Sequence, residues 1–163
     1  MSIFSDGLKG FLGGFASAAA ETLRHGAATA AGMEAVTRLC EAARIPIHAR
    51  DDSSVALLFD DPVVGQRQLT ITAGGTGKFA AFAVRSAANV SPEPDVLKYL
   101  LGRNTRLPLG AWQATNAPGP CRFALTYCAF IAGMDVSTFE YLCDVLLSEV
   151  LDFDTKLRDA GQI

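Results

Sequence analysis

The sequence predicts an α+β domain in which a single antiparallel sheet of five strands packs against helices on one face. Three observations carry this prediction. Short runs alternate between apolar and polar residues, tight Gly- or Pro-containing turns join successive runs, and a long apolar stripe at helical spacing lies near the C-terminus. With 163 residues, half of them apolar, the chain is long enough for one domain with a sizeable core.

The bulk composition excludes several classes of protein. The net charge is −3 and charged residues are spread along the chain, so there is no basic stripe of the kind that nucleic-acid binding requires. Gly, Pro or a charge interrupts every apolar run well before the ~18 residues that a membrane-spanning helix needs. The N-terminus has no basic cluster followed by an apolar stretch, so we expect no secretory signal and a cytoplasmic protein.

The cysteines and histidines form no metal or disulfide pattern. The four cysteines lack a CxxC pair and lie among apolar neighbours, as expected for small buried side chains in a reducing compartment: Cys40, Cys121, Cys128 and Cys143. The chain has two histidines, His25 and His48, which are too few for a Cys/His zinc site of the usual kind. We therefore expect no metal and no cofactor.

Residues 1–31 are rich in Gly, Ala and Ser, and residues 32–163 are taken as the folded domain, with residues 26–32 as a linker. Apolar residues still recur at helical spacing in the first segment: Phe4, Leu8, Phe11, Leu12, Phe15, Ala19 and Leu23. Each glycine weakens a helix by up to ~1 kcal/mol relative to Ala, so the segment should be helical only when packed. It either docks on its own domain or frays, or else it attaches to a membrane surface or a partner.

A helix and three strands are expected next. The helix over residues 33–44 ends before Pro46, because the residue preceding a proline is disfavoured in the α region. Strands follow over residues 54–59, 66–73 and 78–86, and a Gly-rich hairpin turn joins the last two. The string GGTGKF at this turn does not match a phosphate-binding loop, because Thr72 replaces its first glycine and Phe79 its magnesium-binding hydroxyl.

The stretch from residue 91 to 132 organises the rest of the domain. A helix begins with Pro92 at its first position and ends at residues 102–104, with Asn104 as a left-handed cap. Strand 111–115 and the turn 116–120 lead into a strand with two faces. One face is expected to be core: Phe123, Leu125, Tyr127, Ala129 and Ile131. The other face is less polar than a solvated face, which indicates cover by another element or a second subunit: Arg122, Ala124, Thr126, Cys128 and Phe130.

Residues 135–160 form the longest predicted helix. Ser137 and Glu140 are placed as a capping box. A continuous apolar stripe is expected to face the core: Phe139, Leu142, Cys143, Leu146, Val150, Phe153 and Leu157. The acidic residues are assigned to the solvated outer face, with an acidic docking surface as the alternative: Glu140, Asp144, Glu149, Asp152 and Asp154.

Three short motifs carry a family resemblance: YLLGRN from Tyr99 to Asn104, LPLGAW from Leu107 to Trp112, and LDFD from Leu151 to Asp154. Together with the order of elements, they resemble the type III secretion chaperone-like fold, which includes the YbjN-like domains. The resemblance covers residues 33–160. It implies an open antiparallel sheet with helices on one face, frequent dimers and no active site. It also implies a partner chain held against apolar patches and exposed strand edges.

We therefore predict a non-enzymatic, chaperone-like or regulatory domain that binds another protein chain and forms a homodimer. The candidate partner-binding residues are Phe82, Val84, Trp112 and Phe130, and ordinary core packing is the alternative for each. The competing function is a structural or regulatory module attached to a membrane surface or partner through the N-terminal helix. No catalytic residue is proposed, because neither histidine adjoins a nucleophile elbow or an oxyanion loop.

Overall fold

The structure is a computed structural model that describes residues 30–74, 77–90, 94–115 and 121–161. Its helices and strands follow one another as α3 (Ala30–Ala42), β1 (Ile47–Arg50), β2 (Ser54–Asp61), β3 (Gly65–Gly74), β4 (Phe79–Val90), α4 (Pro94–Asn104), β5 (Ala111–Thr115), β6 (Cys121–Phe130) and α5 (Val136–Asp159). The expected helical segment within residues 1–29, the helix start near Pro92 and the turn at 116–120 lie outside the described residues.

The strands form one antiparallel sheet in the order β1-β2-β3-β4-β6-β5. The predicted antiparallel sheet is therefore confirmed, but it has six strands instead of five. The additional strand is β1, which pairs with β2 through Ile47 opposite Leu57 and Arg50 opposite Val55, with an irregularity between Ile47 and Ala49. β1 has only four residues and follows a proline, so its alternation was too short to register as a strand.

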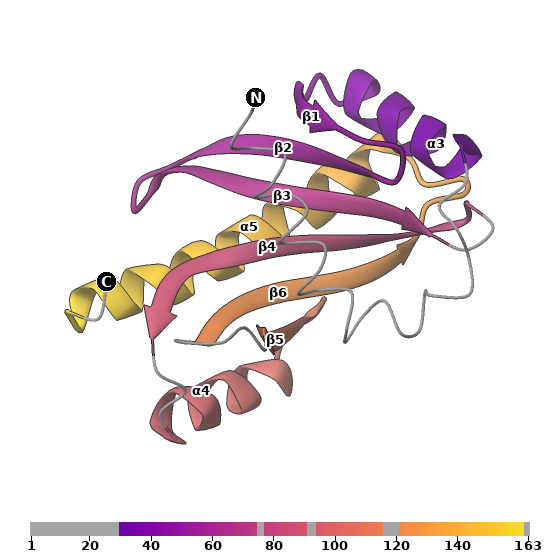
Figure 1. The fold of residues 1–163 in the computed structure, drawn as a ribbon. Coiled ribbons are helices and arrows are strands. Elements are labelled where there is room, and N and C mark those ends of the chain that lie inside the picture. Colours follow the sequence, from indigo (N-terminus) through magenta and orange to yellow (C-terminus); the bar gives the residue numbers. More distant parts are fainter. Residues whose placement is uncertain (1–29, 75–76, 91–93, 116–120, 162–163) are drawn as a thin grey trace.

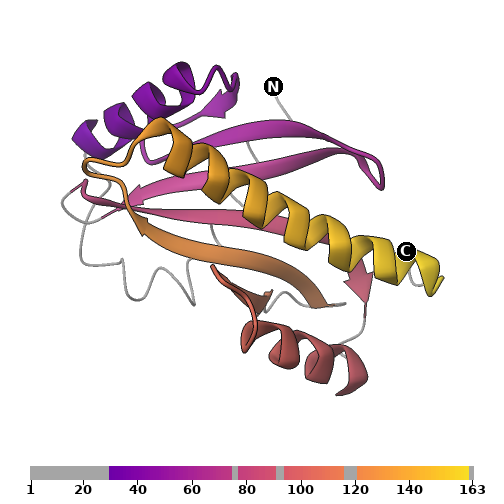
Figure 2. The ribbon, with the colours of Figure 1, turned by 180° about the vertical axis from the view of Figure 1, so that it is seen from behind.

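The helices cover one face of the sheet. α5 runs across the back of the sheet in Figure 1 and across its front in Figure 2, where α3 lies beside the start of α5. Phe139 of α5 packs on Phe82 of β4, with 6.0 Å between the ring centroids. α4 lies next to β5, at the edge of the sheet (Figure 1).

One apolar core lies between the sheet and the helices. Its largest fully buried side chains come from the strands and from α3 and α5: Phe82, Phe123, Phe139, Met33, Leu57, Leu69, Ile71, Leu125 and Leu146. The expected core face of β6 is confirmed, with Phe123 1% and Leu125 0% exposed. The apolar stripe expected on the last helix is buried in the same core.

Helix α3 begins at Ala30, so residues 30–32 belong to a helix and not to a linker. It ends in a Schellman motif, in which Ile45 N–H donates to the Cys40 carbonyl at 2.9 Å and Arg44 N–H to the Glu41 carbonyl at 3.1 Å. Arg44 has φ +57° there. The helix therefore ends with this Schellman motif, two residues before Pro46.

Helix α5 begins two residues earlier than a Ser137 cap would require. Asp135 is the N-cap, and its carboxylate accepts from Thr138 N–H at 2.7 Å and from the Ser137 hydroxyl at 2.7 Å. The capping box of Ser137 and Glu140 is therefore wrong. An aspartate satisfies the same orphan N–H group and adds a negative charge at the positive end of the helix dipole.

Candidate functional site

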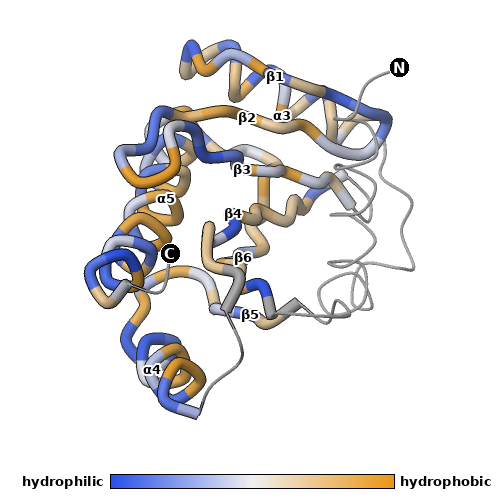
Figure 3. Tube along the Cα trace, turned by 60° about the vertical axis from the view of Figure 1, so that its left-hand side comes forward, coloured by the Kyte–Doolittle hydropathy of each residue, from blue (hydrophilic) through white to orange (hydrophobic). Residues whose placement is uncertain are grey.

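The sheet has a face turned away from α3 and α5, which we call the second face. In Figure 3 the strands β3, β4 and β6 lie to one side of α4 and α5. The strand register places the following residues on the second face: Thr70, Thr72, Phe79, Ala81, Ala83, Arg85, Arg122, Ala124, Thr126, Cys128 and Phe130. Of the described helices, none lies over this face (Figures 1 and 2).

An aromatic pair marks one end of the second face. Phe79 and Phe130 are directly opposite each other on β4 and β6, and their rings meet edge to face with 5.2 Å between centroids. The two side chains are 46% and 53% exposed. Burying both rings against a partner would remove a large apolar area from water, and such rings are typical anchors of protein interfaces.

Small residues form the middle of the second face. Ala83 lies opposite Thr126, and Ala81 lies opposite Cys128. Ala83 and Thr126 are each 8% exposed. The exposed apolar surface of this face is therefore concentrated at the aromatic pair.

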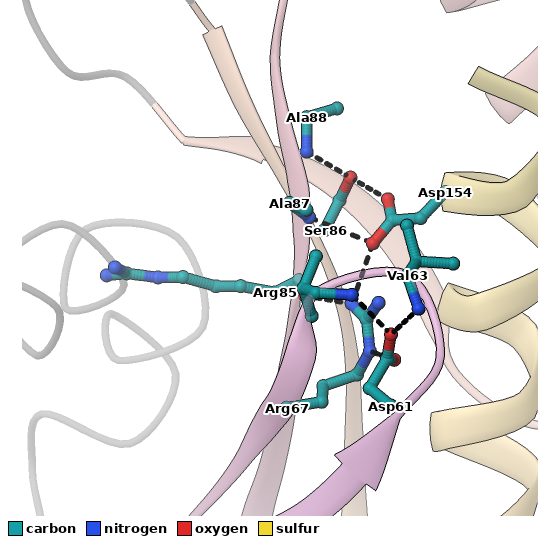
Figure 4. A network of polar contacts seen from close by, with 9 residues as sticks. Asp61, Val63, Arg67, Arg85, Ser86, Ala87, Ala88 and Asp154 are labelled. Carbon is teal, nitrogen blue, oxygen red and sulfur yellow. Dashed lines mark hydrogen bonds and ion pairs between the residues drawn. The ribbon is translucent and has the colours of Figure 1, made fainter. Parts of the chain in front are cut away.

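Two arginines mark the other end. Arg85 follows Phe79 by six residues on β4, a separation of about 20 Å along a strand. Figure 4 shows its side chain pointing away from α5. Burial, together with the nearby charge of Arg122, lowers the pKa of Arg85 to about 10.

The structure separates the four predicted partner-binding residues. Phe82 and Val84 are 0% exposed and Trp112 is 6% exposed, so these three lie in the core, which was the alternative given for them. Phe130 lies on the surface of the second face. Even-numbered residues of β4 face α5, and Trp112 packs on Phe153 of α5 with 4.7 Å between ring centroids. The binding of a partner by these residues stays a prediction.

Phe79 was missing from the sequence prediction. It is the second residue of the strand predicted over residues 78–86. Its alternation with Ala81 and Ala83 on one face, against Phe82 and Val84 on the other, was the available signal. The set with Phe82 and Val84 faces the core, and the set with Phe79 lies on the second face.

The edge of the sheet at β5 is not free for strand pairing. Asn104, at the end of α4, accepts from Trp112 N–H at 2.7 Å and donates to the Trp112 carbonyl at 3.1 Å. The Asn104 side-chain amide thus makes the two hydrogen bonds with Trp112 that the backbone of a neighbouring strand would otherwise make. Asn104 is not among the residues with positive φ, so the predicted left-handed cap is wrong. The other edge, β1, has four residues and an irregular register.

A buried polar network lies on the α5 side of the sheet (Figure 4). Arg67, 3% exposed, donates from Nε to Asp61, and its Nη1 lies 2.7 Å from Asp154 of α5. Ser86 of β4 donates to Asp154, and Ala87 N–H donates to the same carboxylate at 2.9 Å. These contacts tie β2, β3 and β4 to α5.

Asp61 is held in its charged form. Burial alone would raise the pKa of its carboxyl group, but hydrogen bonds from Arg67 and from the N–H groups of Val64 and Val63 hold the pKa below its usual value. Val63 N–H donates at 2.8 Å and Val64 N–H at 2.9 Å. The carboxyl group is therefore ionised near neutral pH, where it is the counter-ion of Arg67.

A second polar cluster joins α4 and β5 to α5. Arg103 donates to both carboxylate oxygens of Glu149, from Nε at 2.8 Å, and Trp112 Nε1–H donates to Glu149 at 3.0 Å. Glu149 is 9% and Asp154 0% exposed, so the assignment of these two acids to a solvated outer face is wrong. Each is paired with an arginine, as buried carboxylates require.

The described residues hold no group of three or more His, Cys, Asp or Glu side chains that could bind a metal ion. Burial raises the pKa of Cys40 to about 11 and that of Cys143 to about 12, so both thiols are protonated near neutral pH. In the described part of the chain, no helix is long and apolar enough to cross a membrane.

Comparison with known proteins identifies the fold. No family model matches the chain, and no curated protein matches it. A chain of the ExsC–ExsE complex is similar in structure, with a TM-score of 0.57 and 18% identity over 75% of this chain and 92% of that one. A chain of the complex between the Yersinia pestis type III secretion chaperone SycH and a stable fragment of YscM2 gives a TM-score of 0.53 and 12% identity, over 74% and 98%.

YbjN from E. coli gives a TM-score of 0.57 and 8% identity, over 83% of this chain and 97% of that one. The protein therefore has the type III secretion chaperone-like fold, in the form that YbjN also adopts. This confirms the resemblance read from the YLLGRN and LPLGAW motifs, at the level of the fold.

Proposed function

We propose that the protein is a non-enzymatic, chaperone-like module that binds another polypeptide through the second face. The observation that carries this proposal is the pair of exposed phenylalanines, Phe79 and Phe130, at the end of an apolar sheet face without a described helix over it. The solved complexes of SycH with a YscM2 fragment and of ExsC with ExsE support protein binding by this fold.

Side-chain contacts on the face are favoured over strand addition at an edge. The side chain of Asn104 already engages the outward N–H and carbonyl of Trp112, and β1 is short and irregular. Strand addition needs a run of unpaired backbone groups, which neither edge offers over more than a few residues.

The residues of the second face indicate which kind of partner segment would bind there. An aromatic or branched aliphatic side chain would pack against the exposed Phe79 and Phe130 rings, and small or apolar residues would lie beside them over Ala81. The proposed partner is thus a short amphipathic or extended segment with a bulky apolar side chain at one end.

A binding role agrees with the chemistry of the buried groups. Asp61, Glu149 and Asp154 are engaged by arginine side chains, and the Cys40 and Cys143 thiols lie in the core. In the described part of the chain these carboxylates tie strands and helices together, and the Ser86 hydroxyl is engaged in the same network as a donor to Asp154.

Site-specific photocrosslinking in the native cells tests the proposal. A benzophenone amino acid replaces Phe130 in one variant and Leu101 in the control, since Leu101 of α4 is 66% exposed and lies away from the second face. We expect a defined crosslinked chain from position 130, absent from position 101, and lost at position 130 when Phe79→Ser is added.

Equal crosslinking from both positions, or an unchanged product in the Phe79→Ser background, would overturn the assignment of the second face. No crosslinked chain at position 130 would overturn protein binding there. The homodimer and the cytoplasmic location stay predictions. Light scattering would distinguish a monomer of 17.2 kDa from twice that mass.

A further inference from the structure

An apolar groove, which we call the α5 groove, lies on the helix side of the molecule, between α5 and the loop that joins α4 to β5. Its volume is about 340 Å³. Residues of the loop and of α5 line it: Leu107, Pro108, Tyr141, Asp144, Val145 and Ser148. None of the described helices or strands lies over the outer side of α5 (Figure 2). The second face is turned away from α5, so the groove and the Phe79–Phe130 pair are on opposite sides of the sheet.

The apolar part of the groove is an exposed aromatic ring beside two half-buried aliphatic side chains. Tyr141 is 58% exposed, and tyrosine is among the residues that most often carry the binding energy of an interface. Val145 follows it by four residues on α5, so the two are neighbours on one side of the helix. Leu107 lines the opposite wall. A bulky apolar side chain that packs here removes further apolar area from water.

Two carboxylates give the α5 wall of the groove a negative charge. Glu140 and Asp144 are exposed and four residues apart, so like charges lie next to each other along the helix. Among the described residues neither forms an ion pair, whereas Asp152 further along α5 pairs with Lys156. Arg106 belongs to the loop on the other wall. A cation beside Glu140 and Asp144 would therefore relieve their mutual repulsion.

The shape of the groove favours a polypeptide segment as its occupant. Pro108, Tyr141, Asp144 and Ser148 are exposed, so the groove is open to solvent along its walls. Sites for small molecules enclose most of the ligand, whereas a groove of this kind receives side chains of a segment that continues along the helix. The carboxylates also repel the anionic headgroups of a membrane surface.

We propose that the α5 groove binds a segment of a partner polypeptide in which a bulky apolar side chain is flanked by lysine or arginine. The apolar side chain packs against Tyr141 and Leu107, and the base lies beside Asp144 and Glu140. This site goes beyond the proposed function, because the groove and the second face lie on opposite sides of the sheet and can be occupied independently. The acidic docking surface that the sequence allowed on this helix thus narrows to Glu140 and Asp144.

Fluorescence anisotropy with two synthetic peptides tests this inference on the full-length protein. Both labelled peptides carry leucines at helical spacing, and they differ only in having lysine or glutamate at the remaining positions. We expect the leucine–lysine peptide to bind about tenfold more tightly than the leucine–glutamate peptide. The difference should shrink with rising salt, because exposed charges are screened.

Two matched double variants locate the binding site. Tyr141→Ser/Asp144→Asn should weaken binding of the leucine–lysine peptide about tenfold, because it removes the ring and one of the two carboxylates. The control is Leu101→Ser/Asp95→Asn, which removes an exposed apolar side chain and an exposed carboxylate from α4 and changes the net charge equally. It should bind as the wild type does. Unchanged circular dichroism and unfolding midpoints show that both variants are folded.

Phe79→Ser/Phe130→Ser should also keep the wild-type affinity, and a loss confined to this variant would place the peptide on the second face and overturn the inference. Absence of binding, equal affinity for the two peptides, or equal weakening by the two matched variants would overturn it as well. A mass that rises above 17.2 kDa with concentration, and does not rise in Tyr141→Ser/Asp144→Asn, would assign the groove to a second copy instead. If the peptides behave as expected but no chain crosslinks at position 130, the inference stands and the proposed function falls.

Discussion

Arg44 occupies a backbone conformation that glycine would adopt at lower cost. Its φ is +57°, in the left-handed region that costs a residue with a Cβ about 1–2 kcal/mol. The residue ends α3 at the position where a glycine is usual in a Schellman motif. Its side chain is exposed, so little packing is lost when it is removed.

We expect Arg44→Gly to stabilise the protein by about 0.5–1 kcal/mol, because relief of the left-handed strain exceeds the added entropy of the unfolded chain. Urea unfolding of the full chain measures the change. Arg44→Ala is the control, since it removes the same side chain but keeps the Cβ. A larger gain from Ala than from Gly would contradict the assignment of strain.

The charge of Asp61 links stability to pH. The unfolded pKa of an aspartate is about 3.9 and the folded pKa of Asp61 is lower, so its contribution is complete above the unfolded value and is lost as pH falls toward the folded value. Replacement by Asn removes the titrating group and its ion pair with Arg67.

We therefore expect the free energy of unfolding of the wild type to exceed that of Asp61→Asn at pH 6, and the difference to shrink as the pH is lowered toward 3. Denaturant titrations of both proteins at several pH values measure this. Asp60→Asn is the control, because Asp60 is the exposed neighbour on the same strand. A difference that is constant from pH 6 to pH 3 would show that Asp61 does not titrate as described.

At the scale of elements, two helical glycines behave in opposite ways. Gly32 of α3 faces the Gly77 backbone, and a Cβ there would also lie 3.1 Å from the Ala73 Cβ. Gly102 of α4 is exposed, and a Cβ there would meet no atom within 4 Å. The first glycine is needed for close packing of a helix on a hairpin, and the second only weakens its helix.

Gly32→Ala should therefore destabilise the protein by about 1–3 kcal/mol through overpacking against backbone. Gly102→Ala should stabilise it by about 0.5–1 kcal/mol, because alanine is the better helix former. Thermal or urea unfolding of the two variants side by side gives the comparison. Changes of the same sign would mean that the contact of α3 with the β3–β4 hairpin is misplaced.

The spacing of apolar residues along the sequence predicted most elements, because it repeats every two residues in a strand and every 3.6 residues in a helix. β3 alternates between Leu69, Ile71 and polar neighbours, and α5 repeats apolar residues over its whole length. β1 was missed since four residues contain too little alternation. The roles of Asn104 and Asp154 depend on partners 8 and 67 or more residues away, which periodicity does not report.

The candidate site was harder to predict for a related reason. Alternation shows that Phe79 and Phe82 lie on opposite faces of β4, but not which face α5 will cover. In β6 the more polar set contained the exposed Phe130, whereas in β4 both sets are apolar. Only the packing of Phe139 on Phe82 decides between them.

At the scale of the whole molecule, the sheet has one face closed by α3 and α5 and one face that ends in exposed aromatic rings. The closed face is held both by the core and by the network that joins Arg67 and Ser86 to Asp154. Removing one partner of a buried ion pair typically costs ~3–5 kcal/mol, so this side is fixed. We therefore expect a partner to bind on the second face.

The exposed aromatic end of the second face should affect the behaviour of the whole molecule. An exposed apolar patch binds hydrophobic dyes and promotes self-association. We expect Phe79→Ser/Phe130→Ser to lower the fluorescence of anilinonaphthalene sulfonate bound to the protein, because both rings are about half exposed in the wild type. Leu101→Ser/Tyr141→Ser is the control, since these residues are 66% and 58% exposed but lie on α4 and α5. Dye binding that persists in the first variant and falls in the control would place the main exposed apolar surface on the helices.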